Sequence, residues 1–507
     1  MKCPLNRAAV IIGIGELTEK LADPQLGREP QELMHDAVKK AELDAGVAIC
    51  ESIDRLDVVM PMSWRYSDLA SQLSEALGAA PAHAELGPSG GESPLRYMHR
   101  SAQAIARGEA EIAVITGGEA QHTLAALQRR GHMPDWTPFA ADGPNFADSG
   151  DAVNPLSLMH GLYLPVNVYG FFEAAFSHSQ GQTPDEAQSI SAQLWARYAA
   201  AAKTNPYSWR QETLSADDIQ TVTAKNRLIG GPYPKYMVAN MNVNQSAAVI
   251  ITSLETAQRL GVCADKMIFV GGGASADEPR DFLQRDQYKV CHAQNAVLNA
   301  MRGLMAGVPD ALEIYSCFPC VPKMAQEILK WPLGTSPTVT GGLSFFGAPL
   351  NNYMTHAACA MVRRLRAGAP SGSGGLLYGQ GEFMTKHYGL MLSPRVASAA
   401  ETVLTPNTAQ KAADAQRSPP PPLDAEASGP AVIETFTLMY DRSGELEKGV
   451  VMARMADGRR TLAAVEAADV DALKRLSNGD HYPIGAAGNI KTVPKLASRW
   501  HFAESPN

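Results

Sequence analysis

The sequence repeats one order of elements in two halves, and this repetition constrains the fold more than any other feature. In each half a short, fully apolar run is followed by an amphipathic helical segment and then by a further apolar run. The first such run is 8–14, and its counterpart is 267–270, which ends at Gly271. Apolar runs of strand length without polar alternation are typical of strands covered on both faces. We therefore predict an α/β protein with a duplicated βαβαβ unit.

Composition and charge argue against several classes of function for this 507-residue chain. Its 44 basic residues are outnumbered by 52 acidic ones, and the resulting net charge of −8 repels nucleic-acid phosphates. Because no 18 consecutive residues are apolar, the sequence predicts no membrane-spanning helix. The seven cysteines are scattered and odd in number, unlike those of a secreted disulfide scaffold. We expect a cytoplasmic protein with no nucleic-acid or membrane partner.

Shifts in composition divide the chain into five parts. We expect a first half at 1–120 and 241–265, an inserted loop domain at 121–240, a second half at 266–395, a linker at 396–430 and a small β-rich domain at 431–507. The insertion is rich in Trp, Tyr, Asn and Pro and has helical periodicity only around 186–202. The last part has strand-like runs and an Asp457-Gly458 turn signal, which favour a small OB-like barrel.

Two local patterns lie beside glycine-rich loops. After Gly91, Ser93 is a good N-cap residue and Pro94 a good first residue for a helix that ends before Gly108. The short run 338–340, before Gly341, predicts a strand.

Three motifs in this order resemble the thiolase superfamily over roughly residues 5 to 395. The run from Gly341 to Leu350, Gly-Gly-Leu-Ser-Phe-Phe-Gly-Ala-Pro-Leu, is similar to the GGxxxxGHP loop of the family. The segment 101–119 is similar to the stretch that follows the family's nucleophile. Asn244-Gln-Ser-Ala-Ala248 stands where the family usually has Asp-Gly-Ala-Ala. The resemblance implies a five-layered α-β-α-β-α fold.

Thiolases make and break carbon–carbon bonds in acyl-CoA thioesters, and the resemblance implies where their catalytic groups would stand. This chemistry needs a cysteine thiolate at a helix N-terminus, an activating His, a second Cys and an oxyanion hole. Gly91 occupies the nucleophile position and Ala348 the position of the activating His. The last loop, 378–387, has no Cys, and Tyr315 replaces the oxyanion-hole residue. We therefore expect ordinary thiolysis and Claisen condensation to be lost.

Several residues on these loops could still bind or convert a ligand. We predict Tyr315 and His387 as catalytic acid or base residues, with a core tyrosine and a surface residue as the alternative interpretations. A further set, on the same loops, is predicted to bind substrate: Ser93, Cys317, Gly347 and Glu382. Ser93 is also explained as a helix cap, and His356 as a packed helix histidine.

Three functions follow from these expectations. The first is a CoA- or acyl-CoA-binding protein of the acetyl-CoA acetyltransferase family without ordinary thiolase activity. The second is an aldolase that cleaves a β-hydroxyacyl-CoA, with the C-terminal domain in the part that a separate OB-fold companion plays in some thiolase-fold aldolases. The third is a non-catalytic partner protein. CoA or acyl-CoA is the only ligand expected, with no further cofactor and no metal, and the resemblance implies a homodimer or higher oligomer.

Overall fold

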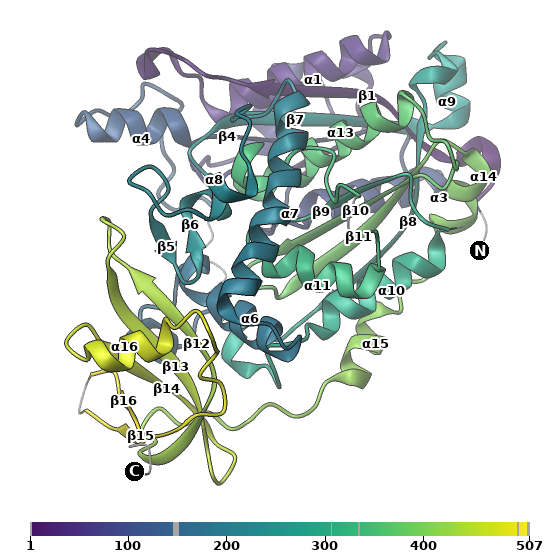
Figure 1. The fold of residues 1–507 in the computed structure, drawn as a ribbon. Helices are drawn as coiled ribbons and strands as arrows, with labels where there is room; N and C mark the ends of the chain where they lie inside the picture. Colours follow the sequence, from purple (N-terminus) through teal and green to yellow (C-terminus); the bar gives the residue numbers. More distant parts are fainter. Residues whose placement is uncertain (1–2, 145–151, 306, 333–334, 494–495, 504–507) are drawn as a thin grey trace.

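A computed structural model describes residues 3–144, 152–305, 307–332, 335–493 and 496–503 (Figure 1). Nine strands form one sheet in the order β3-β2-β4-β7-β1-β8-β11-β10-β9. These strands are β1 (Ala9–Thr18), β2 (Arg55–Val58), β3 (His83–Leu86), β4 (Ile112–Ala120), β7 (Asn244–Ser253), β8 (Ile268–Asp277), β9 (Ala311–Ile314), β10 (Gly375–Gly381) and β11 (Lys386–Ser393). From the centre of the sheet outward, the strand order is β1-β7-β4-β2 in the first half and the equivalent β8-β11-β10-β9 in the second. The predicted duplication is therefore confirmed.

The two halves meet at a short antiparallel contact between their first strands. Only Val10 with Phe269 and Ile11 with Ile268 are paired across β1 and β8. In both halves a helix connects the first strand to a strand that is not its neighbour in the sheet. Helix α1 (Pro30–Ala45) connects β1 to β2 in the first half, and α10 (His292–Leu304) connects β8 to β9 in the second.

The helices and half-sheets form five layers. The helices α3 (Ser93–Arg107) and α13 (Tyr353–Arg366) contact strands of both halves and form the central layer. On the outer faces, α1 packs on β1, β4 and β7, and α10 packs on β8 and β11. The smaller helices α2 (Leu69–Leu77) and α11 (Cys320–Leu329) accompany α1 and α10. The predicted α-β-α-β-α arrangement is therefore confirmed.

Two glycines of β1 permit its close contact with α1. A Cβ on Gly13 would lie 2.1 Å from the carbonyl oxygen of Ala41, and one on Gly15 would lie 1.9 Å from that of Ala37. Both distances are far below van der Waals contact, so only glycine lets the helix backbone approach the strand.

The insertion is more helical than the sequence pattern predicts. It contains α4 (Gln121–Arg129), α5 (Pro155–Met159), α6 (Pro165–Ser179), α7 (Pro184–Thr204) and α8 (Ala216–Gln220). The expectation of helix only around 186–202 is therefore wrong. The sequence pattern does not indicate helix α6, because most of its residues are buried and it lacks the polar face that gives helical periodicity.

The C-terminal part closes a five-stranded barrel. Its strands are β12 (Gly429–Tyr440), β13 (Leu446–Met455), β14 (Arg460–Glu466), β15 (Ala487–Lys491) and β16 (Arg499–Phe502). They follow the order β12-β13-β14-β16-β15, and β12 closes the ring by pairing with both β13 and β15. The helix α16 (Val470–Leu476) lies between β14 and β15 in the chain. This closed five-stranded barrel confirms the predicted OB-like domain.

The barrel is joined to the rest of the molecule by strand pairing and by a buried arginine. Two short strands of the insertion, β5 (Leu228–Gly230) and β6 (Tyr233–Pro234), extend its sheet at β12. Arg460 of β14 is fully buried and donates hydrogen bonds to the carbonyl oxygens of Leu283, Arg285 and Asp286. The segment predicted as a linker contains α14 (Val396–Thr402) and α15 (Ala409–Gln416).

Two local predictions need correction. The helix α3 begins at Ser93, one residue earlier than predicted, and Glu92 occupies the cap position. The run 338–340 is not a strand. The carboxylate of Glu313 accepts the backbone N–H groups of Val339 and Thr340, at 2.9 and 3.0 Å, and so takes the donors that a strand would pair.

The remaining helices are α9 (Leu254–Arg259) and α12 (Gly342–Phe345). Among the described residues, no helix has both the length and the apolar character needed to cross a membrane.

Candidate functional site

The glycine-rich loops of the two halves meet at the N-terminus of α3. The Asn351 side chain joins two of them, because its Oδ1 accepts the backbone N–H of Gly90 at 3.0 Å and the hydroxyl of Ser89 at 3.2 Å. Lys386, from the β10–β11 hairpin, donates to the carbonyl oxygen of Ser89 at 2.9 Å. The segment predicted as the nucleophile loop is therefore held by both of the later loops.

Gly91 faces Tyr315 directly. A Cβ built on Gly91 would lie 2.6 Å from the Tyr315 hydroxyl and 2.5 Å from the carbonyl oxygen of Gln380. Tyr315 is 8% exposed, and its backbone N–H donates to Tyr378 at 3.0 Å. Burial raises the pKa of Tyr315, and the Cys317 thiol and the Glu92 carboxylate raise it further. The Tyr315 hydroxyl is therefore protonated at neutral pH and fills the space beside residue 91.

Cys317 belongs to the same cluster. The Gln380 amide donates to its sulfur at 2.9 Å and to the Tyr169 hydroxyl at 2.9 Å. The Tyr169 ring stacks on Phe318, with 4.4 Å between ring centroids. Burial raises the pKa of Cys317 to about 12, which makes it a neutral thiol and a weak nucleophile.

Glu92 was not identified from the sequence, although it stands between Gly91 and Ser93. It is 2% exposed, and its Oε2 has no hydrogen-bond partner among the described residues. Arg96 Nη2 lies 3.7 Å from its Oε1, and burial raises the pKa of the carboxyl. A Cβ on Gly381 would lie 2.4 Å from the Oε2 atom, so the glycine lets the two loops meet at this carboxyl. A buried carboxyl with an unpaired oxygen is a candidate acid or base.

Glu382, by contrast, is fully engaged. It pairs with Arg280 at 2.9 Å and with Lys386 at 2.8 Å, and it accepts the Thr385 hydroxyl at 3.0 Å. Burial alone would raise the pKa of Glu382, but the hydrogen bonds from Lys386 and Arg280 outweigh it and the pKa is lowered. The geometry gives Glu382 a role in holding the hairpin.

Ser93 and the pair Gly347-Ala348 lie in ordered, buried positions. The Ser93 hydroxyl has no hydrogen-bond partner in the described parts of the chain, so no base activates it there. Gly347 has φ +119°, and a Cβ there would lie 2.5 Å from Gln245 Oε1. Ala348 donates its N–H to Asn240 at 2.9 Å. The Gly341–Leu350 and Asn244–Ala248 motifs are therefore in contact.

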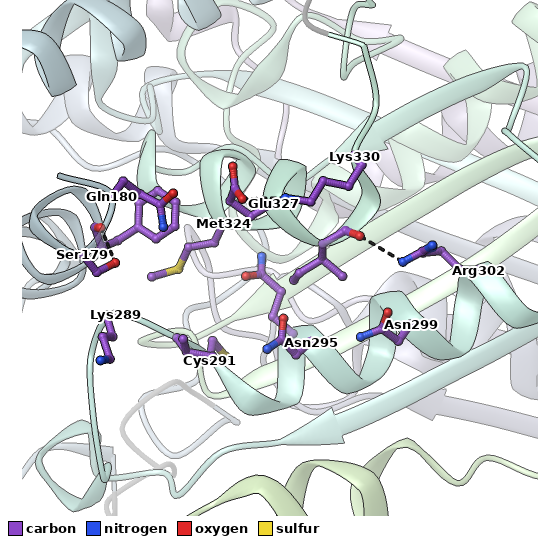
Figure 2. A pocket seen from close by; sticks show the side chains of 14 residues that line it. Ser179, Gln180, Lys289, Cys291, Asn295, Asn299, Arg302, Met324, Glu327 and Lys330 are labelled. Carbon is purple, nitrogen blue, oxygen red and sulfur yellow. Dashed lines mark hydrogen bonds and ion pairs between the residues drawn. The ribbon is translucent and has the colours of Figure 1, made fainter. Parts of the chain in front are cut away.

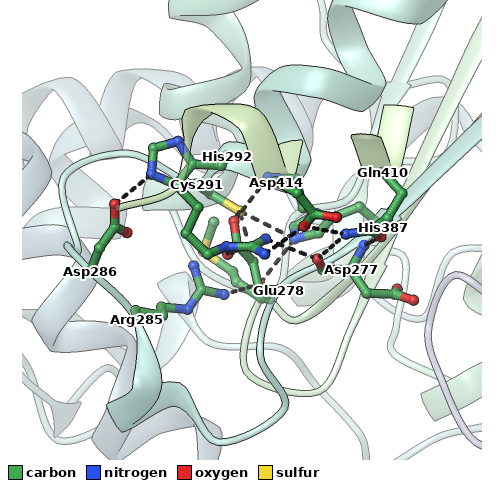
Figure 3. Close-up of polar contacts among 12 residues, drawn as sticks. Asp277, Glu278, Arg285, Asp286, Cys291, His292, His387, Gln410 and Asp414 are labelled. Atoms are coloured by element: carbon green, nitrogen blue, oxygen red, sulfur yellow. Dashed lines mark hydrogen bonds and ion pairs between the residues drawn. The ribbon is translucent and has the colours of Figure 1, made fainter. Parts of the chain in front are cut away.

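His387 lies in a different cluster (Figure 3). It is fully buried in β11, with Nδ1 2.7 Å from the Tyr378 hydroxyl and Nε2 3.2 Å from Cys291 Sγ. Burial lowers the pKa of His387 to about 4, so the imidazole is neutral at pH 7. Its hydrogen-bond partners do not include Tyr315. The alternative of a surface residue is excluded by this burial.

His356 is a buried helix histidine, as expected. Its Nδ1 lies 2.7 Å from Glu16 Oε1, and Glu16 also pairs with Arg363.

One group of side chains in the described part of the molecule has spacing suited to a metal ion: Asp57, His83 and Glu85. Arg100 pairs with the carboxylates of Asp57 and Glu85 at 2.6 and 2.9 Å, and Arg55 pairs with Asp57 at 2.9 Å. Because the two guanidinium groups already neutralise both carboxylates, this group is an ion-pair network.

Comparisons with known proteins concern the fold and the C-terminal domain. The family described as the thiolase-like protein type 1 additional C-terminal domain matches residues 410–493. A monomeric SCP2-thiolase-like protein type 1 from Mycobacterium smegmatis is 30% identical, with a TM-score of 0.80, over 98% of this chain and 99% of that chain. No curated protein sequence matches.

Two more distant structures share the fold alone. The Ltp2-ChsH2(DUF35) aldolase is 20% identical, with a TM-score of 0.57, over 77% of this chain and 99% of that one. Human mitochondrial 3-ketoacyl-CoA thiolase in complex with CoA is 14% identical, with a TM-score of 0.54, over 78% of this chain and 99% of that one.

Proposed function

The chain belongs to the family of SCP2-thiolase-like proteins of type 1, and on this premise we propose that it binds CoA or an acyl-CoA at the loops around Gly91 without ordinary thiolysis. One observation carries the proposal. The Tyr315 hydroxyl and the Gln380 carbonyl oxygen occupy the space that a cysteine at position 91 would need. Since Ala348 stands at the position of the activating histidine, neither the nucleophile nor its base is supplied there.

Two measurements on the full chain test this proposal. Acetoacetyl-CoA with CoA, at micromolar protein, should give no thiolysis above the uncatalysed rate, while a genuine thiolase assayed in parallel should turn over. Titration with CoA and with acyl-CoAs of increasing chain length should raise the melting temperature in a saturable way. Clear thiolysis would refute the loss of activity. A melting temperature that no CoA ester changes would refute the binding, and a stable heteromer in native mass spectrometry would then favour a partner protein.

Retro-aldol cleavage of a β-hydroxyacyl-CoA is a second candidate, and the Glu92 carboxyl favours it. In this reaction a base takes the proton of the β-hydroxyl, and the Cα–Cβ bond breaks to release a carbonyl compound. The electron pair moves into the thioester enolate, which then takes a proton at Cα. No acyl-enzyme is formed, so the glycine at position 91 is no obstacle. We assign the base role to Glu92, and a hydrogen bond to the thioester oxygen to Tyr315. The likeness to the Ltp2-ChsH2(DUF35) aldolase concerns the fold alone.

Conservative variants separate this candidate from simple binding. Tyr315→Phe and Glu92→Gln should each abolish cleavage and leave acyl-CoA affinity nearly unchanged. His387→Gln serves as the comparison, because the sequence predicts His387 as an alternative catalytic residue. Cleavage that survives both Tyr315→Phe and Glu92→Gln would rule out the assigned roles, and cleavage lost only with His387→Gln would move the chemistry to the other cluster.

The homodimer implied by the superfamily remains a prediction, and two observations favour a monomer. The M. smegmatis relative is described as monomeric. The edge strand β3 has only four residues, and a very short edge strand disfavours pairing with a second copy. Light scattering decides between 54.2 kDa and twice that mass.

A further inference from the structure

The turn of the β10–β11 hairpin, residues 380–386, has two residues in a backbone conformation that usually requires glycine. Glu382 and Met384 both have φ +56°. Residues other than glycine adopt this left-handed region at a cost in free energy, so the surrounding structure has to hold them there. The same turn places the carbonyl oxygen of Gln380 beside Gly91. The supports of the turn therefore set the geometry of the candidate site.

Arg285 supports this turn from the segment 281–288, which lies between β8 and α10 in the chain. Its Nη2 donates to the carbonyl oxygen of Phe383 at 3.3 Å and also to that of Met384. One guanidinium group therefore fixes the peptide groups on both sides of Met384. Arg285 is 1% exposed and lies beside the carboxylate of Glu278 (Figure 3). A buried charge with such partners is held in one place.

The barrel holds the same segment. Arg460 of β14 donates to the carbonyl oxygens of Leu283 and Asp286, at 2.9 and 3.3 Å. It donates to the carbonyl oxygen of Arg285 as well. Its guanidinium also lies over the Tyr288 ring, 5.2 Å from the ring centroid. The barrel thus fixes the backbone of Arg285, and Arg285 fixes the hairpin turn with its side chain.

We propose that Arg285 is a positioning residue for the site around Gly91, and that it couples the docking of the barrel to the conformation of the hairpin turn. With the barrel docked, the segment presents the guanidinium to the turn, and Glu382 and Met384 stay left-handed. Without this support the turn relaxes, and the carbonyl oxygen of Gln380 moves away from Gly91. The inference rests on the proposed function only for what the site binds.

A second support of the turn limits the size of the expected effect. The Tyr169 hydroxyl donates to the carbonyl oxygen of Glu382 at 3.2 Å and accepts the N–H of Met384 at 3.2 Å. Tyr169 belongs to α6 of the insertion and does not depend on Arg285. Loss of the Arg285 side chain should therefore loosen the turn locally and leave the rest of the sheet folded.

Hydrogen exchange of the full chain, read by mass spectrometry on peptides that cover 380–386, tests the proposal. In the first minutes the turn should exchange roughly tenfold faster or more in Arg285→Met and in Arg460→Met than in the wild type. The strand β4 should stay protected over this time in every variant, because it opens only with the whole fold. Where a methionine variant does not fold, Arg285→Lys and Arg460→Lys keep the charge but not the planar fork of donors, and should give a smaller acceleration.

Three control variants change neighbouring residues and leave the two links intact. Tyr288→Phe removes the hydroxyl that donates to the carbonyl oxygen of Phe282 at 2.6 Å, inside the same segment. Arg454→Met removes a guanidinium that pairs with Glu434 within the barrel. Lys289→Gln removes a cation that lines a surface cavity of about 420 Å³ between α10, α11 and α6, whose described lining includes no residue of the turn (Figure 2). None of the three should change the exchange of the turn by more than about twofold.

The other outcomes overturn separate parts of the proposal. Unchanged exchange of the turn in the Arg285 variants overturns its support by this side chain. Faster exchange in these variants but not in the Arg460 variants overturns the coupling to the barrel. Equal acceleration in the controls would mean a general loss of stability and overturns both.

The affinity for acetyl-CoA, measured by calorimetry, is the second measurement. It should be weakened roughly tenfold in Arg285→Met and in Arg460→Met. A loosened turn with unchanged affinity would overturn the role of Arg285 in positioning this site. A wild-type protein that binds no CoA ester would refute the proposed function instead, and hydrogen exchange would still decide whether the barrel and the turn are coupled.

Discussion

The hydroxyl of Tyr315 lies 2.6 Å from the point at which a side chain on residue 91 would begin. These two residues come from different halves of the duplicated fold, and the tyrosine side chain fits where it does only because residue 91 is a glycine. A side chain at position 91 requires Tyr315 to move, and the carbonyl oxygen of Gln380 at 2.5 Å leaves no second direction. Position 91 therefore lacks a nucleophilic side chain, and its neighbours leave no space for one.

We therefore predict that Gly91→Cys destabilises the protein and does not create thiolase activity. The added side chain overpacks a buried site, which costs about 1–3 kcal/mol, and Ala348 supplies no base for the new thiol. Urea unfolding and a thiolysis assay measure the two effects. Gly303→Ala is the control, because nothing lies within 4 Å of a Cβ at that helical position. Ala at position 303 should be neutral or stabilising. A Gly91→Cys protein as stable as the wild type would contradict the packing described here.

The carboxylate of Glu278 gives a prediction about pH. Burial would raise its pKa, but Arg285, the N–H of Ala293 at 2.9 Å and Arg417 outweigh burial and lower it to about 2. The ordinary value is 4.5. The carboxylate therefore contributes roughly 3 kcal/mol of stability above pH 4.5, and this contribution is lost as the pH falls from 4.5 to about 2.

Glu278→Gln should accordingly lower the free energy of unfolding by roughly 3 kcal/mol at pH 7 and by less than half as much at pH 3. Urea titrations at the two pH values measure this difference. The exposed Glu445→Gln should show little effect at either pH. A loss for Glu278→Gln that is independent of pH would mean that the ionised form is not the stabilising one.

A buried ion pair holds the insertion to the second half. Lys323 of α11 pairs with Glu173 of α6 and donates to the hydroxyl of Ser191 at 3.1 Å. Removing one buried partner leaves an uncompensated charge, so Lys323→Met should cost about 3–5 kcal/mol. The double variant Lys323→Met with Glu173→Gln should recover part of that loss. Lys330→Met, at the exposed end of the same helix, should cost less than about 1 kcal/mol. Equal losses at positions 323 and 330 would contradict the burial of the first pair.

Substitutions of the buried Arg460 and of the adjacent, exposed Arg459 can be compared to test how the barrel is held against the rest of the molecule. Arg460 is fully buried and bonds three carbonyl oxygens of the 283–286 segment as well as Glu434, whereas Arg459 is 43% exposed in its side chain. Arg460→Met should destabilise the protein by about 3–5 kcal/mol and speed protease cleavage within 396–430. Arg459→Met should change neither measurement appreciably. Unchanged cleavage in Arg460→Met would show that strand pairing alone holds the barrel.

The sequence predicts the parts of the fold that have regular patterns. The apolar strands β1 and β8, the helix α3 and the order of the three motifs are enough to predict the duplicated layers. Helix α6 could not be predicted in the same way, because its residues are buried on nearly all sides. The 338–340 run has strand composition, yet Glu313, distant by 25 residues or more in the chain, binds its N–H groups.

The candidate site is predictable only where a motif places it. The motifs predict the positions of Gly91 and Tyr315 in the sequence. The contact between these two residues depends on how the two halves pack, which no motif predicts. Glu92 carries no motif signal, and its importance depends on a buried, unpaired oxygen that only coordinates reveal. The sequence predicts His387 on an active-site loop, whereas it is a buried residue of β11 whose side chain contacts Cys291.

The core and the barrel are parts of one chain, and β5 of the insertion pairs with β12 of the barrel. When such a barrel is a separate subunit, its occupancy depends on both concentrations and on a dissociation constant. Here the two lie on one chain, and two strands of the insertion extend the sheet of the barrel, so each core has its own barrel at any dilution. Dilution and unequal expression therefore cannot separate the barrel from its core. Only a cut in the chain or a change in the shared sheet can do so.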